Sequence, residues 1–162
     1  MKSIARAIIV VTLAPLLTLA PGTSQAADGP FAAFAGSWSG SGIIEVRDGS
    51  RERIRCRSGN TESGNSLKLG LKCASDSYRF ELTGDIAYDG GNISGSWGET
   101  TRGVYGSLSG RMSRGNIQAT AQSPGVNASL SITSSGGRQN VSIRSPGSEV
   151  SEVSISMGRG GR

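Results

Sequence analysis

The sequence contains no histidine and only two cysteines among its 162 residues. Histidine is the commonest general base and metal ligand of proteins and a frequent ligand of haem iron. Its absence therefore removes the usual means of catalysis, metal binding and haem binding. Two thiols alone do not complete a zinc site. We predict no catalytic residues, no metal site and no cofactor, and we expect a protein that is not an enzyme.

Helical periodicity is missing as well. After residue 26, no segment repeats apolar residues at the spacing of an amphipathic helix. Short runs of alternating apolar and polar residues recur instead, separated by turns that contain many of the 25 glycines. This pattern is typical of an all-β protein. We predict an up-and-down antiparallel β-barrel of about eight to ten strands, with a two-sheet sandwich as the alternative.

The first residues have the composition of a targeting segment. Lys2 and Arg6 precede an apolar run over residues 7–20, and Ser24-Gln25-Ala26 supplies small residues for cleavage. The run is short for a membrane span and is interrupted by Pro15, so we expect cleavage rather than a retained anchor.

The chain is therefore expected to have three parts: a signal peptide over 1–26, a single barrel domain over 27–158 and a flexible tail over 159–162. We predict a periplasmic or secreted protein with no transmembrane segment after processing. Of the net charge of +5, two charges belong to the signal peptide, which leaves +3. Because there is no basic helix or aromatic-rich basic patch, we expect no nucleic-acid partner.

The clearest strand is the run FAGSWSGSGIIEV over residues 34–46. Its alternation places Trp38 and Ile44 on the same, inward face. A three-residue loop over residues 48–50, with Gly49 left-handed, is predicted to set Ile44 opposite Ile54. The later turn at residues 89–92, with Gly90 and Gly91 at its tip, is predicted to set Tyr88 opposite Ile93 and Gly84 opposite Trp97.

The two cysteines fall on inward positions of consecutive strands. Placing Cys56 opposite Cys73 also sets Ser58 opposite Leu71, so both faces keep their character. Because the chain is predicted to be exported, we expect a disulfide between them, which would contribute about 3 kcal/mol. The alternative, a reactive thiol pair, requires an exposure that inward positions do not provide.

The interior is the first candidate site. Small inward residues such as Gly40, Gly95, Gly106 and Ala128 are expected to leave space, and a ten-stranded barrel has room for a small molecule. The alternative is that these side chains pack against one another without a cavity. The aromatic residues expected to contact a small apolar or amphipathic ligand are Trp38, Tyr78, Phe80, Tyr88 and Trp97.

The outer face of the second to fourth strands is the second candidate site. It is expected to carry six basic side chains, namely Arg53, Arg55, Arg57, Lys68, Lys72 and Arg79. Such a face could bind an anionic component of the cell envelope or an acidic protein, as an envelope-interacting or inhibitor module would. The alternative is a solvated face neutralised by nearby carboxylates. Glu99 and Arg102 are interpreted as turn and rim residues rather than an acid–base pair.

A resemblance to a known family rests on Gly36-Ser37-Trp38. A Gly-x-Trp that enters the first strand of a meander resembles the calycin barrels: lipocalins, avidin-like proteins and nitrobindin-like proteins. The chain as a whole is similar to small secreted proteins of alphaproteobacteria. The resemblance implies that Trp38 packs across one end of the barrel. It does not extend to the haem of nitrobindins, which a histidine holds, or to the biotin pocket of avidins, which needs several tryptophans.

Overall fold

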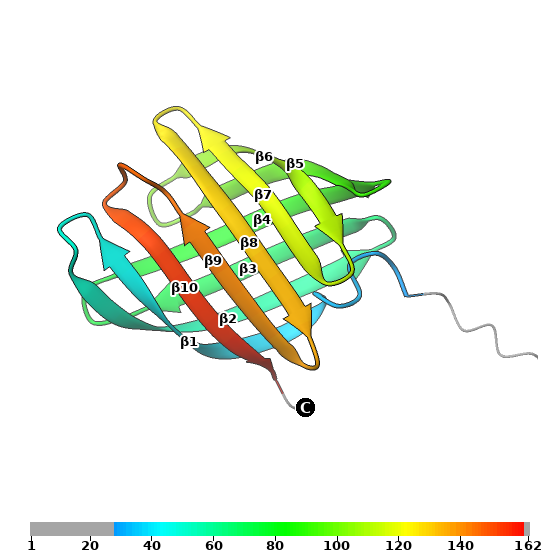
Figure 1. Ribbon diagram of the computed structural model, residues 1–162, viewed down its shortest axis with the longest axis horizontal. Helices are drawn as coiled ribbons and strands as arrows, with labels where there is room; N and C mark the ends of the chain where they lie inside the picture. Colours follow the sequence, from blue (N-terminus) through cyan, green and yellow to red (C-terminus); the bar gives the residue numbers. More distant parts are fainter. Residues whose placement is uncertain (1–27, 161–162) are drawn as a thin grey trace, which may run out of the picture.

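The computed structural model describes residues 28–160, and in it ten strands form one closed antiparallel barrel (Figure 1). The strands are β1 (Gly36–Val46), β2 (Arg51–Ser63), β3 (Ser66–Ala74), β4 (Arg79–Asp89), β5 (Asn92–Glu99), β6 (Val104–Ser113), β7 (Asn116–Ser123), β8 (Val126–Ser135), β9 (Arg138–Arg144) and β10 (Val150–Arg159). Each strand pairs with its neighbours in sequence, and β1 pairs with β10 to close the sheet. The predicted up-and-down barrel is confirmed. The predicted signal peptide lies outside the described residues.

The turn chemistry predicted from the sequence is largely confirmed. Tyr88 lies opposite Ile93 and Gly84 opposite Trp97. Gly90 and Gly91 at the tip both have positive φ. A two-residue turn that requires positive φ at both central positions explains why two glycines stand there.

The register of the first hairpin was predicted wrongly by two residues. Ile44 lies opposite Glu52 rather than Ile54, and Gly42 takes the place opposite Ile54. The backbone N–H of Val46 donates to the carbonyl of Ser50 at 2.9 Å, so the three-residue loop covers residues 47–49. Gly49, with φ of 86°, is therefore the last residue of the loop and not its middle. A type I turn followed by a left-handed glycine has this order, and the inward face of each strand is unchanged.

One end of the barrel is closed by the segment before β1. Phe31, Phe34 and Trp38 are almost completely buried there. The carbonyl oxygen of Phe34 accepts hydrogen bonds from Trp38 Nε1 and Asn60 Nδ2, both at 3.0 Å. We call this end, defined by these three aromatic residues, the plugged end. Its Trp38 occupies the position that the calycin resemblance implies.

β10 reaches the plugged end one residue beyond the expected domain boundary. Arg159 pairs with Trp38 in the sheet, and its guanidinium carbon lies 4.4 Å from the centre of the indole ring. The Nη1 of Arg159 also donates to the carbonyl of Ala35 at 2.9 Å. Arg159 therefore belongs to the barrel, where its side chain lies over Trp38 at the plugged end, and not to the tail predicted over 159–162.

Candidate ligand-binding cavity

The barrel contains a cavity of about 340 Å³. Most of its wall is aliphatic or aromatic, contributed by residues from β3 to β10. Loop residues Tyr78, Arg102, Ser148 and Glu149 also line it, and all of them lie at the end opposite the plug. We call this end the mouth. A concave, largely apolar site with few polar groups is the usual form of a small-molecule pocket.

Three of the five aromatic residues predicted to contact a ligand line this cavity. Tyr78, Phe80 and Trp97 are on its wall. Trp38 and Tyr88 are not, because they belong to the plugged end, where the ring of Tyr88 meets Phe31 edge-on at 6.3 Å. The sequence pattern placed all five side chains inside the barrel but carried no information about depth along its axis.

The small residues have two different roles. Ala121 and Ala128 line the cavity, and the size of Ala128 had suggested this. Gly40, Gly95 and Gly106 do not line it. A Cβ on any of them would instead overlap a carbonyl oxygen of the adjacent strand. Glycine at such positions permits close approach of two backbones in a strongly curved sheet. Their expected contribution to cavity space was therefore wrong.

Trp97 shows how one glycine shapes the wall. Gly106 lies opposite Trp97 on the neighbouring strand. The indole of Trp97 passes over it, and Nε1 donates to the carbonyl of Gln122 on β7 at 3.3 Å. The indole is thus held against the sheet by a hydrogen bond that spans three strands.

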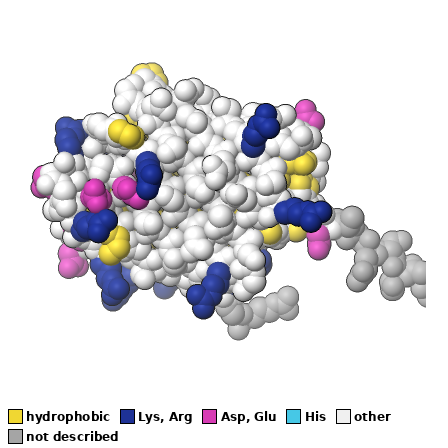
Figure 2. All heavy atoms as spheres, viewed as in Figure 1, with side chains coloured by type: hydrophobic (Ala, Val, Ile, Leu, Met, Phe, Trp, Pro, Cys, Tyr) yellow, Lys and Arg dark blue, Asp and Glu magenta, His cyan; other side chains and the backbone are white. Residues whose placement is uncertain are grey.

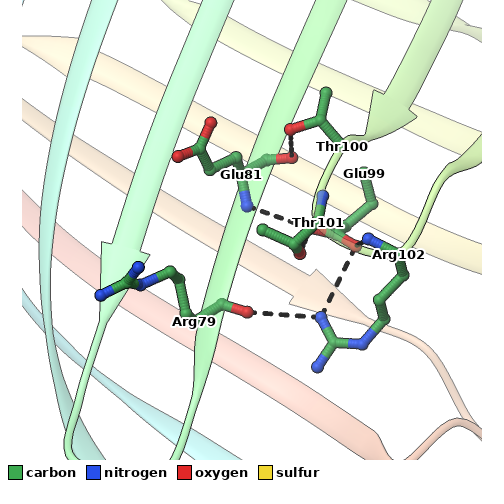
Figure 3. A network of polar contacts seen from close by, with 6 residues as sticks. All are labelled: Arg79, Glu81, Glu99, Thr100, Thr101 and Arg102. Carbon is green, nitrogen blue, oxygen red and sulfur yellow. Dashed lines mark hydrogen bonds and ion pairs between the residues drawn. The ribbon is translucent and has the colours of Figure 1, made fainter.

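A polar network fixes the mouth between β4, β5 and β6 (Figure 3). The carboxylate of Glu99 accepts hydrogen bonds from the backbone N–H groups of Glu81 at 3.0 Å, Thr101 at 3.2 Å and Arg102 at 2.8 Å, and from the hydroxyl of Thr101. Arg102 Nη1 lies 3.5 Å from this carboxylate and donates to the carbonyl of Arg79 at 3.4 Å. Glu99 and Arg102 are therefore rim residues, as predicted.

The environment of Glu99 favours its charged form. Burial acts to raise the pKa of this carboxyl, but the hydrogen bonds from Thr101, Glu81 and Arg102 outweigh it, so the pKa lies below its ordinary value. A carboxylate that accepts this many hydrogen bonds stabilises the turn in its charged form and is poorly suited to proton transfer.

The deep end of the cavity contains two buried polar residues that the sequence analysis did not single out. Ser58 donates to Asn60 Oδ1 at 2.8 Å. Gln139 is only 2% exposed, and its Nε2 has no hydrogen-bond partner among the described residues. The alternation of Gln139, Val141 and Ile143 was the available signal, since it places a carboxamide on the inward face of β9.

The six predicted basic residues are all exposed on the outer surface of β2, β3 and the first residue of β4. Lys68 pairs with Asp85 at 3.0 Å and Lys72 with Glu81 at 3.2 Å. Within residues 28–160, no ion pair is found for the three arginines of β2, Arg53, Arg55 and Arg57. On the face that contains β8, β9 and β10, most of the surface is white, and separate Lys, Arg, Asp and Glu side chains are scattered over it (Figure 2).

The part of the chain that the structure describes also lacks two other features. It contains no group of three or more His, Cys, Asp or Glu side chains placed to hold a metal ion. It also has no helix with the length and apolar character needed to cross a membrane.

Comparison with solved structures identifies the fold. Rv2717c from M. tuberculosis aligns with a TM-score of 0.62 and 13% identity, covering 81% of this chain and 95% of its own. The S-type phycobiliprotein lyase CPES from Guillardia theta aligns with a TM-score of 0.56 and 10% identity, covering 82% and 91%. The chain therefore shares its barrel fold with these two structures. No protein-family model and no curated protein matches the sequence. At these identities, the two structures establish the architecture and nothing about activity.

Proposed function

We propose that this protein is a non-catalytic binding protein that holds a small apolar or amphipathic ligand inside its barrel. The observation that carries the proposal is the apolar cavity of about 340 Å³, which lies at the lower end of the roughly 300–1,000 Å³ typical of small-molecule sites. Phe80, Trp97 and Tyr78 supply aromatic contact area on its wall. The ligand would pass through the mouth, because the opposite end is filled by the plug.

The compartment forms part of the same proposal. We infer that residues 1–26 are removed on export and that the barrel functions in the periplasm or outside the cell. The disulfide between Cys56 and Cys73 supports this inference, because disulfides form and persist in oxidising compartments.

A space-filling substitution tests the proposal. Ala121 lines the cavity, so Ala121→Phe should occupy part of the ligand's volume and weaken binding of the neutral fluorophore N-phenylnaphthylamine by about tenfold or more. Ala87→Phe is the matched control, because Ala87 is exposed on the outer face of β4 and should leave binding unchanged. Trp97→Ala, which removes a wall residue, should also weaken binding. Equal affinities of the wild type and Ala121→Phe, or no fluorophore binding by the wild type, would contradict a ligand inside the barrel.

The second candidate function is an envelope-interacting or inhibitor module that acts through the basic face. Three exposed arginines on alternate residues of one strand, without carboxylate partners among residues 28–160, favour it. Arg55→Glu combined with Arg57→Glu should abolish binding to anionic phosphatidylglycerol vesicles and spare fluorophore binding. Ala121→Phe should have the reverse effect, so the two functions are separable in one set of variants.

A further inference from the structure

Gln139 is a buried polar side chain on the wall of a cavity that is otherwise largely apolar. It begins the inward face of β9, between Ser134 on β8 and Met157 on β10. Three buried side-chain atoms of the described residues lack a hydrogen-bond partner, and those of Asn116 and Ser123 do not belong to this cavity. The third atom is Gln139 Nε2, and the Gln139 side chain does line the cavity. A buried donor without a partner is costly and uncommon in native proteins, so it calls for an acceptor.

No acceptor among the described residues lies within hydrogen-bond distance of Gln139 Nε2, and the neighbouring buried polar groups bond to one another or to the plug. The hydroxyl of Ser58 donates to Asn60, and Asn60 donates in turn to the carbonyl of Phe34. The hydroxyl of Ser134 donates to the carbonyl of Ala33. These groups form contacts within the protein that tie the barrel wall to the plug. Gln139 stands apart from them with two N–H donors, and its terminal torsion is soft enough to turn the carboxamide toward a ligand.

The charge distribution along the cavity restricts the ligand group that can meet Gln139. The charged side chains on the described cavity wall are Glu99, Arg102 and Glu149, and all three lie at the mouth. A carboxylate or phosphate at the deep end would be buried without a counter-ion, which is strongly unfavourable. A neutral acceptor, such as a ketone, ester or amide carbonyl, requires only a hydrogen bond.

We propose that the cavity binds an apolar molecule carrying a neutral carbonyl group, which enters carbonyl-first and accepts a hydrogen bond from Gln139 Nε2. This inference rests on the proposed function, because it requires a ligand in the barrel. The aliphatic part of the molecule lies along Phe80, Trp97 and the other apolar wall residues toward the mouth.

Three probes with the same number of carbons test this arrangement: methyl octyl ketone, decane and decanoic acid. Each is titrated against the purified protein by displacement of N-phenylnaphthylamine. Gln139→Leu should weaken ketone binding about tenfold, because the carbonyl would then be buried without a donor, and should not weaken decane binding. Gln118→Leu is the matched control, since Gln118 is exposed on β7 and should leave all three affinities unchanged. Ionised decanoic acid should bind more weakly than the ketone.

The outcomes distinguish ligand binding in the barrel from the specific role of Gln139. If decane and the ketone bind but Gln139→Leu leaves ketone affinity unchanged, the role of Gln139 is refuted while ligand binding stands. If decanoic acid binds more tightly than the ketone and loses affinity in Gln139→Leu, the neutral head group is refuted. If the wild type binds neither the fluorophore nor any probe, both are refuted. Gln139→Leu should melt at or above the wild-type temperature, since it removes an unpaired donor, and Gln139→Met repeats the test with an unbranched side chain.

Discussion

At the scale of single residues, the position of Trp97 depends on the absence of a side chain at residue 106. A Cβ on Gly106 would lie 2.8 Å from Trp97 Nε1 and would also overlap the carbonyl oxygen of Gln122. The glycine thus allows β6 and β7 to approach while the indole crosses above them. A residue that contributes no atoms to the cavity therefore determines the shape of its wall.

Gly106→Ala should consequently lower the free energy of unfolding by about 1–3 kcal/mol, because overpacking against backbone cannot be relieved by a side-chain rotation. It should also weaken fluorophore binding, since the indole must move. Chemical denaturation followed by titration measures both effects. Gly59→Ala is the control, because Gly59 is exposed in β2 and a Cβ there meets no atom within 4 Å. Similar stability of Gly106→Ala and Gly59→Ala would show that the overlap is relieved at no cost.

At the scale of elements, the turn between β5 and β6 depends on the Glu99 carboxylate. Three backbone N–H groups and one hydroxyl donate to this carboxylate. It therefore satisfies the backbone of the turn, as backbone carbonyl groups do in a shorter hairpin. The same turn positions Arg102 at the mouth. The order of this rim is therefore coupled to the charge on one side chain.

Glu99→Gln should lower the free energy of unfolding at neutral pH by about 1–3 kcal/mol, the cost of weakening hydrogen bonds to a buried charged group. Because the pKa of Glu99 is depressed in the folded state, its stabilising effect is fully present above the ordinary value of 4.5 and is lost as the pH falls through the folded value. The difference between wild type and variant should therefore shrink in acid, as measured by urea denaturation across pH. Glu45→Gln, which affects only the exposed pair with Arg51, should cost less than 1 kcal/mol by comparison. A Glu99→Gln deficit that persists unchanged in acid would contradict this account.

At the scale of the whole molecule, closure of the sheet and the disulfide are separate sources of stability. β1 and β10 are joined by sheet pairing and by side-chain contacts such as that of Arg159 with Trp38, whereas Cys56 and Cys73 link two consecutive strands that are already paired, with their Cα atoms 4.2 Å apart. The disulfide restricts the unfolded chain over a sequence separation of 17 residues. It does not participate in closing the barrel.

Replacing both cysteines with alanine should therefore lower the free energy of unfolding by about 2–4 kcal/mol and leave the folded barrel intact. Guanidinium denaturation gives the first quantity, and fluorophore affinity reports the second. Reduction of the wild-type protein should produce a similar loss of stability. A double variant that folds but no longer binds the fluorophore would show that the disulfide also shapes the cavity.

The sequence by itself determined the all-β architecture, the order of about eight to ten strands, the disulfide and the inward or outward direction of most side chains. These features follow from local chemistry: period-two alternation, glycines at turns that need positive φ, and short connections that make sequential strands neighbours. Even the error in the first hairpin preserved the faces, because a shift of two residues retains the alternation.

Only the tertiary structure decided which inward residues meet at the same depth. Alternation distinguishes inside from outside but says nothing about position along the barrel axis, so Trp38 and Tyr88 could not be separated from Phe80 and Trp97. The same limit applies to Gly106, because alternation does not show that the indole of Trp97 crosses it to reach Gln122. Gln139 is an unpaired donor on the cavity wall because its neighbour on β10 is the apolar Met157 and its neighbour on β8, Ser134, bonds to Ala33 instead. These relations arise from the packing of side chains between strands, which no local pattern encodes.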